Sequence, residues 1–392
     1  MTKKRILIIS PFFFPEPIST GKFNTDLAVA LRDKGNTVTV LCSHPFYPDW
    51  KPIKSTTQIE GITIIRGGGA IKYSNKATLR RILLELWYAF FVLKHIFKLR
   101  KKNDIIIPVF PPSLAFYTIL PYIKKRIVKI GMVHDLQEIY ASNKKGSIQK
   151  IIRFFIHKIE KRVFRSCDRL IFLSNEMKDT AKRHYNLEES KLVVQYPFTT
   201  YKKDRITNDL ENLMQKDLKH VVYSGALGEK QNSKKLYDFF NYTSKNIENV
   251  QFHFFSQGTN FNNLKSQNDN NKIKFHDLVP SKNVEELYKR STVQIIPQLP
   301  GISKGSLPSK LPNLLNAGCS ILAITDKGSE IERLFKKYNL NTVVTLWDNE
   351  ELCSVLEKIL KKEHKENLHH IKIAQKLFNI DAMIIKILSI NS

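Results

Sequence analysis

The sequence predicts an α/β protein of two Rossmann-like domains with parallel sheets that face each other across a cleft. Short apolar segments rich in β-branched residues alternate with amphipathic helical segments along the chain, a pattern typical of parallel sheets. The alternation restarts after a polar, charged stretch at 201–217, which we interpret as an interdomain linker. The 392 residues are enough for two or three domains.

The first half opens with a β-α-β unit. A strand is expected at 5–10, a proline-rich loop at 11–21, a helix ending on Gly35 at 22–35, and a second strand at 36–43. Later apolar segments predict further strands, at 61–67, 104–110, 126–135 and 168–174, and an apolar segment at 192–198 ends this half. Residues 1–200 therefore form the predicted N-terminal domain.

The second half repeats this order, and we assign 218–375 to a C-terminal domain. Its expected strands lie in five apolar segments, at 219–225, 250–256, 272–280, 291–298 and 319–326. Apolar residues recur with a helical period from about 366 to 389, which predicts a terminal helix. We assign 376–392 to that helix, with the first domain as its candidate packing partner.

Charge and composition narrow the classes of function. The chain carries 63 Lys and Arg against 36 Asp and Glu, and residues 1–200 hold +20 of the net +27. The first half is therefore expected to face an anion: a membrane surface, a nucleic acid or a phosphorylated substrate. No uncharged apolar run approaches the ~20 residues of a membrane span. Four widely spaced cysteines without C-x-x-C favour a reducing cytosol.

Several motifs are absent from the sequence. It contains no G-x-G-x-x-G after a strand, no P-loop, no G-x-S-x-G, no H-E-x-x-H and no D-x-D. These absences weigh against a dehydrogenase, a P-loop enzyme, a serine hydrolase and a transferase that binds a metal through carboxylates.

The loop YSGALGEKQ (223–231) is the first candidate phosphate site. Gly225 ends an expected strand, and Lys230 comes just before an expected helix. Backbone N–H groups at a helix start hold phosphate, and a lysine adds charge. An ordinary β-α turn with a surface lysine would explain this loop equally well.

The loop LPSKLPNLLNAG (307–318) is the second candidate. Pro308, Ser309 and Lys310 lie at the start of another expected helix, where free N–H groups favour an anion. A plain N-cap serine would explain this loop without a ligand. Both loops follow strands of the same domain, where open α/β sheets bind ligands, and the pair is stronger evidence than either loop alone.

Two residues of the first half are weaker candidates. Gly21, in the first β-α loop, would let the backbone approach a phosphate, although a turn glycine is the simpler explanation. His134 follows the strand at 126–133 and would point into the cleft, where it could bind a substrate hydroxyl or donate a proton.

The segment 76–102 predicts a long helix with two apolar faces. One face suits the core and comprises Ile82, Leu83, Leu86, Phe90, Leu93 and Phe97. The opposite face mixes cations with aromatic rings and includes Arg80, Trp87, Phe91, Lys94 and Lys98. That mixture suits an anionic membrane surface, and a buried helix with solvated ends explains it nearly as well.

Together these residues resemble the family-4 retaining glycosyltransferases of GT-B fold. The likeness is strongest to the branch that builds colanic acid, capsule and O-antigen, which includes fucosyl- and N-acetylfucosaminyl-transferases. It is carried by four segments in order along the chain: PEPISTGKF (15–23), HPFYPDWKP (44–52), YSGALGEKQ (223–231) and LPSKLPNLLNAG (307–318).

The resemblance implies a nucleotide-sugar donor, with UDP favoured over GDP, and a lipid-linked glycan as acceptor. It implies retention, neither metal nor cofactor, and a cytoplasmic protein on the inner face of the cell membrane. Lys230, Ser309 and Lys310 would bind the diphosphate with help from Gly21. Leu278 and Val279 would lie near the base, and His134 would contact the donor sugar.

Two departures from the family pattern concern the donor site. The two signature glutamates, eight positions apart, are replaced by Gly305 and Asn313, and the usual arginine of the first loop is Ala226. Asn313 could hold the ribose only as a neutral partner. An inactive or unusually selective member of the family would show these changes.

Two other functions stay open. A nucleotide-sugar 2-epimerase shares the fold but does not need a basic, aromatic membrane face. A non-enzymatic basic protein that binds a membrane or a nucleic acid would also fit the charge, but we expect no nucleic-acid partner because no recognition motif or basic tail is present.

Overall fold

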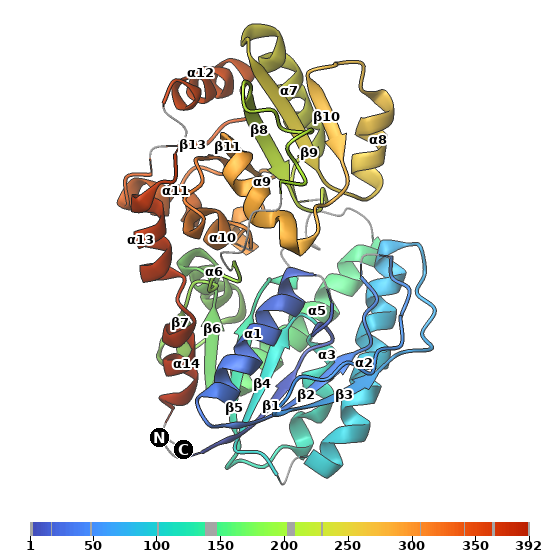
Figure 1. The fold of residues 1–392 in the computed structure, drawn as a ribbon. Helices are drawn as coiled ribbons and strands as arrows, with labels where there is room; N and C mark the ends of the chain where they lie inside the picture. Colours follow the sequence, from blue (N-terminus) through green and yellow to red (C-terminus); the bar gives the residue numbers. More distant parts are fainter. Residues whose placement is uncertain are drawn as a thin grey trace. The chain divides into compact units, whose positions relative to one another are not determined.

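The computed structural model describes residues 3–16, 18–47, 49–99, 102–137, 147–201, 208–228, 230–305, 307–340, 342–362 and 365–390. The chain divides into two compact units (Figure 1). Unit 1 comprises residues 1–200 together with 379–392, and unit 2 comprises residues 201–378. The segment 201–217, which we assigned to a linker, falls within unit 2.

Unit 1 is built on a parallel sheet of seven strands, in the order β3-β2-β1-β4-β5-β6-β7. The strands coincide with the apolar segments that predicted them, apart from shifts of a few residues at their ends. Their bounds are Arg5–Ile9 (β1), Thr37–Ser43 (β2), Ile62–Gly67 (β3), Ile105–Phe110 (β4), Val128–Val133 (β5), Arg169–Phe172 (β6) and Leu192–Val194 (β7).

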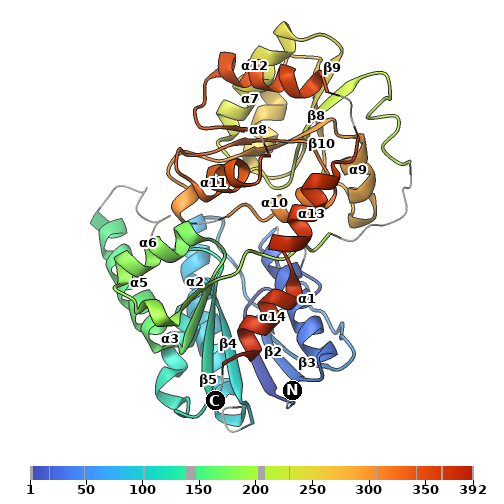
Figure 2. The ribbon, with the colours of Figure 1, turned by 90° about the vertical axis from the view of Figure 1, so that its left-hand side faces the viewer.

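Helices cover both faces of this sheet, as Figure 2 shows for α14 and α3 on opposite sides of the strands. The α1 and α14 helices pack together, and α2, α3 and α5 form a second group in which α3 contacts both others. The helices of unit 1 are Ser19–Asp33 (α1), Ala77–Leu99 (α2), Leu114–Ile119 (α3), Ser147–Ser166 (α5), Asn175–Tyr185 (α6) and Ile380–Leu388 (α14). Short 3-10 turns lie at Leu120–Tyr122 and Glu189–Lys191.

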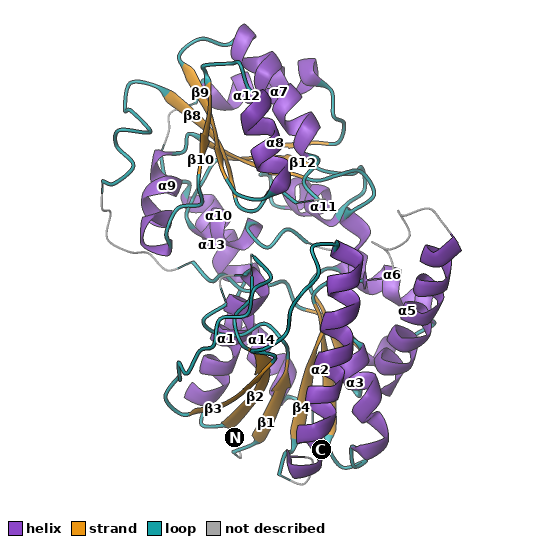
Figure 3. Ribbon diagram, turned by 90° about the vertical axis from the view of Figure 1, so that its right-hand side faces the viewer, coloured by secondary structure: helices purple, strands orange, loops and turns teal. Residues whose placement is uncertain are grey.

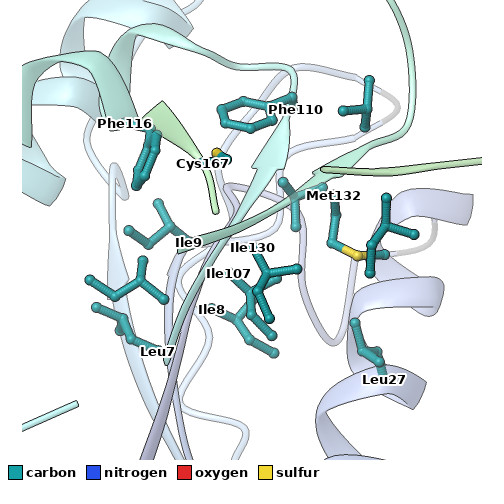
Figure 4. Packing of buried hydrophobic residues seen from close by; sticks show 14 of the residues in the cluster. Leu7, Ile8, Ile9, Leu27, Ile107, Phe110, Phe116, Ile130, Met132 and Cys167 are labelled. Atoms are coloured by element: carbon teal, nitrogen blue, oxygen red, sulfur yellow. The ribbon is translucent and has the colours of Figure 1, made fainter. Parts of the chain in front are cut away.

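The core of unit 1 lies between the sheet and its helices. On one face of the sheet the buried residues Ile8, Ile107 and Ile130 lie toward Leu27 of α1, and on the other face Leu7 and Ile9 lie toward Phe116 of α3 (Figure 4). Parallel strands buried on both faces are expected to be continuously apolar, which accounts for the runs RILII and IIIPVF.

Unit 2 contains a parallel sheet of six strands, in the order β10-β9-β8-β11-β12-β13. The bounds are Lys219–Ser224 (β8), Val250–Phe255 (β9), Ile273–His276 (β10), Val293–Pro297 (β11), Ile321–Ile324 (β12) and Val343–Val344 (β13). The strand order reverses at β8, because β9 pairs on one side of it and β11 on the other.

The helices of unit 2 also fall into groups, with α12 packed on α7 and α13 on α10 (Figure 3). Their bounds are Ser233–Asn246 (α7), Thr259–Gln267 (α8), Val284–Arg290 (α9), Leu311–Asn316 (α10), Glu330–Lys337 (α11), Asn349–Leu360 (α12) and Leu368–Leu377 (α13). Short 3-10 turns lie at Ser281–Asn283 and Ser303–Gly305.

The C-terminal segment forms two helices, whereas the sequence predicted one. The side chain of Asn379 caps α14 by accepting a hydrogen bond of 2.7 Å from the N–H of Asp381, so a new helix begins there. Met383, Ile384 and Ile387 of α14 are buried in the core of unit 1. An ion pair of 2.9 Å between Lys34 and Asp381 joins α14 to the end of α1.

Candidate functional site

The two loops singled out in the sequence lie side by side in unit 2. One follows β8 and the other follows β11, and these strands are paired neighbours at the point where the strand order reverses. The N–H of Leu299, in the second connection, donates a hydrogen bond of 2.8 Å to the carbonyl of Lys230 in the first. The carboxyl ends of strands at such a reversal are where open parallel sheets bind ligands.

Lys310 reaches from the start of α10 back to the ends of both strands. Its Nζ donates hydrogen bonds to the carbonyls of Ile295 at 2.8 Å and Ser224 at 3.4 Å. It also lies 4.0 Å from the centroid of the Tyr223 ring, a favourable cation–π position. Burial lowers the pKa of Lys310 to about 7, because the ammonium loses its hydration there. A bound anion would favour the charged form and raise that pKa.

The loop after β8 begins at Gly225, directly after the last strand residue, Ser224. Gly225 has a φ of +125°, which an L side chain rarely adopts, and no atom lies within 4 Å of a methyl group placed there. The α7 helix then begins without a side-chain cap on its first N–H groups, and Lys234 and Lys235 are exposed in its first turn. Two lysines at the positive end of a helix dipole are unfavourable unless an anion is bound nearby.

The loop before α10 differs from our simpler explanation for it. Lys310, and not Ser309, occupies the N-cap position, and no side chain caps the helix. Ser309 is exposed and Pro308 is half-buried. The Oδ1 of Asn313 accepts a hydrogen bond of 3.0 Å from the N–H of Tyr201, so this amide helps to hold the beginning of unit 2 on α10.

Leu278 and Val279 line a cavity of about 380 Å³ beside the ends of β9 and β10. Segment 208–217 contributes the apolar side chains of Leu210 and Leu213. Hydrogen bonds to α9 hold this segment, from the N–H of Leu210 to the carboxylate of Glu286 at 3.0 Å and from Arg290 to the carbonyl of Met214 at 3.3 Å. The cavity is of a size that accepts a small ligand.

His134 lies at the carboxyl end of β5 in unit 1, as predicted. Its ring meets Phe23 edge to face at 4.8 Å, and Phe23 stacks on Phe198. The buried Nε2 has no hydrogen-bond partner among the described residues. Burial lowers the pKa of His134 to about 4, so the ring is neutral at pH 7. Of the two expected roles, the neutral ring suits hydrogen bonding and not proton donation.

Gly21 has a packing role that the sequence did not indicate. It lies inside α1 and is buried, and a methyl group placed there would approach the carbonyl oxygen of Glu16 to 2.9 Å. The carboxylate of Glu16 accepts hydrogen bonds from the N–H groups of Phe46 and Tyr47 at 2.9 and 2.8 Å. Gly21 therefore allows close packing of the loop that carries Glu16.

The structure reverses the predicted faces of α2. Trp87 and Phe91 are half-buried against Gly68 and Gly67, and Trp87 donates a hydrogen bond of 2.8 Å to the hydroxyl of Tyr73. Arg80 is also half-buried, 4.5 Å from the ring of Trp50. The two rings fit here because the glycines carry no Cβ. Of the predicted membrane-facing residues, Lys94 and Lys98 remain exposed.

The exposed stripe of α2 instead contains four of the six residues predicted for the core, while Leu83 and Leu93 are half-buried. Phe90 is 71% exposed and Leu86 57%, and Leu79, Ile82 and Phe97 are exposed with them. In the neighbouring α5, Ile151, Phe154 and Phe155 are exposed among cations that include Lys150, Arg153 and Lys158. We call the exposed residues of α2 and α5 the apolar-basic face. In the described part of the chain, no helix is both long and apolar enough to cross a bilayer.

Sequence reasoning missed a line of three histidines in unit 2. His220, His253 and His276 lie on the adjacent strands β8, β9 and β10 and are joined by hydrogen bonds. The signal available was a polar residue inside each apolar strand, most clearly in VQFHFF. Aligning the three required the strand order, which the sequence alone did not provide.

Comparison with known proteins identifies the fold and one domain. Residues 20–200 match the family model Glycosyltransferase Family 4. Sucrose-phosphate synthase from Thermosynechococcus elongatus has 14% identity to this chain, covers 98% of it with 97% of its own length, and superposes with a TM-score of 0.73. WaaG, a glycosyltransferase involved in lipopolysaccharide biosynthesis, has 13% identity to this chain. The match covers 98% of this chain and 100% of WaaG, with a TM-score of 0.69.

A putative UDP-N-acetylglucosamine 2-epimerase from Listeria monocytogenes has 12% identity to this chain. The match covers 99% of this chain and 96% of the epimerase, with a TM-score of 0.58. No curated protein sequence matches the chain. The two parallel-sheet units have the GT-B fold. Together, the family match and this fold support an enzyme, a glycosyltransferase.

The buried Lys310 predicts a specific dependence of stability on pH. Its pKa is about 7 in the folded protein and about 10.4 in an unfolded chain. Between these values the unfolded state binds more protons, so this lysine makes the folded state more stable as pH rises.

The difference in unfolding free energy between the wild type and Lys310→Met should therefore shift in favour of the wild type from pH 7 to 10. Denaturant titrations should show no such shift below pH 6, and a difference independent of pH across 7–10 would contradict the burial argument.

Proposed function

We propose that this protein transfers a sugar from a nucleotide-diphosphate-sugar to a lipid-linked oligosaccharide, in the synthesis of a bacterial capsule, O-antigen or exopolysaccharide. The observation that carries the proposal is the pair of hydrogen-bonded loops at the ends of β8 and β11, with Lys230 in one and Lys310 in the other. A departing diphosphate needs stabilisation of its developing charge, which lysines and helix N–H groups can supply.

We propose that the transfer retains the configuration of the sugar and uses no metal. In such a reaction the diphosphate leaves, and its oxygen takes the proton of the acceptor hydroxyl on the same face of the sugar. Lys310 suits this step because an anion would raise its lowered pKa, so the side-chain amine would be protonated to the ammonium when the diphosphate is present. Activity that survives chelation of divalent cations would support the metal-free reaction.

The cavity at Leu278 and Val279 is the proposed site of the base, with UDP favoured over GDP. It belongs to the same unit as the two loops, and its walls are apolar with a few polar groups, as small-ligand sites usually are. Asn313 remains the proposed neutral contact to the ribose, in place of the usual glutamate.

We propose that the apolar-basic face binds the anionic inner surface of the cell membrane, which makes this a peripheral cytoplasmic protein. Large exposed apolar side chains such as Phe90 and Phe155 are costly in water unless they meet a partner. The cations among them favour anionic lipid headgroups over a neutral surface. A membrane site would also bring the protein to a lipid-linked acceptor.

The 2-epimerase is the alternative enzyme, and its support is the likeness in fold to a putative enzyme of that kind. An epimerase would change the donor sugar with no acceptor present. The apolar-basic face favours the transferase, because a soluble nucleotide-sugar is the epimerase's only substrate.

Replacing Lys230 should weaken nucleotide binding. Loss of a charge-assisted contact to phosphate should raise the dissociation constant of UDP about tenfold or more for Lys230→Ala. Calorimetry with UDP, GDP, TDP and CMP on the wild type and the variant measures this effect. Lys245→Ala, at the opposite end of α7, is the matched control and should bind like the wild type. Equal affinities for wild type and Lys230→Ala would place the phosphate site elsewhere.

A charge placed on the apolar-basic face should reduce membrane binding. Phe90→Glu removes an exposed apolar ring and adds repulsion, so its partition onto vesicles of anionic lipid should fall about tenfold. Vesicle sedimentation measures the bound fraction. Ile385→Glu, at another exposed apolar position on α14, serves as the control and should bind as the wild type does. If both variants bind equally, the face is not the membrane contact.

Replacing His134 should lower turnover more than nucleotide affinity. His134→Ala removes the one hydrogen bond that the neutral ring can make to the substrate. Turnover should therefore fall about tenfold, while the dissociation constant of UDP stays unchanged. His134→Gln keeps hydrogen-bonding capacity and should recover part of the rate. Full activity of His134→Ala would remove this residue from the site.

A further inference from the structure

The three histidines of unit 2 form a continuous hydrogen-bonded line. Nδ1 of His220 lies 2.9 Å from Nε2 of His253, and Nδ1 of His253 lies 3.1 Å from Nε2 of His276. His220 and His253 are buried, and His276 is half-buried at the end of β10. At the other end of the line, Nε2 of His220 lies 2.8 Å from the carbonyl oxygen of Gln215.

The carbonyl of Gln215 sets the direction of every hydrogen bond in this line. A carbonyl can only accept, so Nε2 of His220 carries the proton and its Nδ1 accepts when the ring is neutral. Nε2 of His253 must then donate, which leaves Nδ1 of His253 to accept. By the same step Nε2 of His276 donates, and Nδ1 of His276 is left as an acceptor.

The surroundings keep His253 and His276 neutral at pH 7. Burial, together with the neighbouring histidines and Lys274, lowers the pKa of His253 well below its usual value. Burial and the cations Lys274 and Lys265 lower the pKa of His276 to about 4, against an opposing effect of Asp277. A cationic imidazole carries a proton on both ring nitrogens, so a cationic His276 would lose its acceptor at Nδ1, and this environment disfavours the cationic form at pH 7.

The acceptor end of the line belongs to the cavity described above. His276 lines that cavity with Leu278 and Val279. The ring of Phe255 stacks on it at 4.5 Å, with 22° between the planes, and fixes its orientation. Nδ1 of His276 has no hydrogen-bond partner among the described residues.

We infer that His276 selects the base of the nucleotide, by presenting Nδ1 as an acceptor for a ring N–H group, and that His220 and His253 act as positioning residues that hold it in this tautomer. The inference rests on the proposed function, since it takes the cavity as the base site. Uracil and guanine carry a ring N–H on their pairing edge. Cytosine carries a lone pair at the corresponding ring nitrogen, which the Nδ1 lone pair would repel.

UDP and CDP form a matched pair of probes for this inference. Calorimetry on the wild-type protein should show UDP binding at least about tenfold more tightly than CDP, because one hydrogen bond becomes a repulsion. In His253→Phe, His276 loses the acceptor that fixes its tautomer, and the ratio of the two affinities should fall severalfold. His370→Phe replaces another buried histidine of unit 2 that lies outside the line and should keep the wild-type ratio.

A second measurement does not depend on nucleotide binding. The nitrogen NMR shifts of the imidazoles should show His276 protonated at Nε2 in the wild type and a mixture of tautomers in His253→Phe. Equal binding of UDP and CDP by the wild type, or a protonated Nδ1 on His276, overturns the inference while the nucleotide site stands. If neither nucleotide binds although the NMR pattern is as expected, the proposed function has failed and base selection fails with it.

Discussion

The reversal of strand order beside β8 is the constraint on which the candidate site depends. The chain runs from β8 to β9 on one side and later returns to β11 on the other, so the two loops follow strands whose ends are paired. The hydrogen bond between Leu299 and Lys230 can form only because of that adjacency. A sheet with its strands in simple sequence order would leave the same two sequences apart.

Lys310 is the charged group at the centre of this candidate site. Its ammonium is held by two carbonyls and an aromatic ring, all neutral, and burial lowers its pKa to about 7. A buried cation without a charged partner destabilises the folded chain because it loses its hydration. A bound anion would offset that desolvation cost. The arrangement is therefore more readily explained by a diphosphate than by stability.

The sequence contained enough information for the fold and for the two loops, because continuous apolar strands and glycine at a positive φ are local features. The sequence did not suffice to predict which face of α2 is buried, because both faces carry large apolar side chains. Only the missing Cβ atoms of Gly67 and Gly68, remote in sequence, decide that Phe91 and Trp87 turn inward and Phe90 outward. The line of three histidines could not be predicted from the sequence for a related reason. Its members come together only because β8, β9 and β10 are adjacent in the sheet.

The same strand order gives unit 2 a spacing that suits a nucleoside diphosphate. The lysine site lies between β8 and β11, and the cavity with His276 lies two strands away at β10. Neighbouring strands are about 4.8 Å apart, so the two sites are separated by roughly 10–12 Å along the sheet edge. At one end lysine side chains are available to an anion, and at the other a neutral ring offers a lone pair. A single ligand with a charged diphosphate and a base bearing an N–H group would satisfy both ends, which neither a free phosphate nor a free base can do.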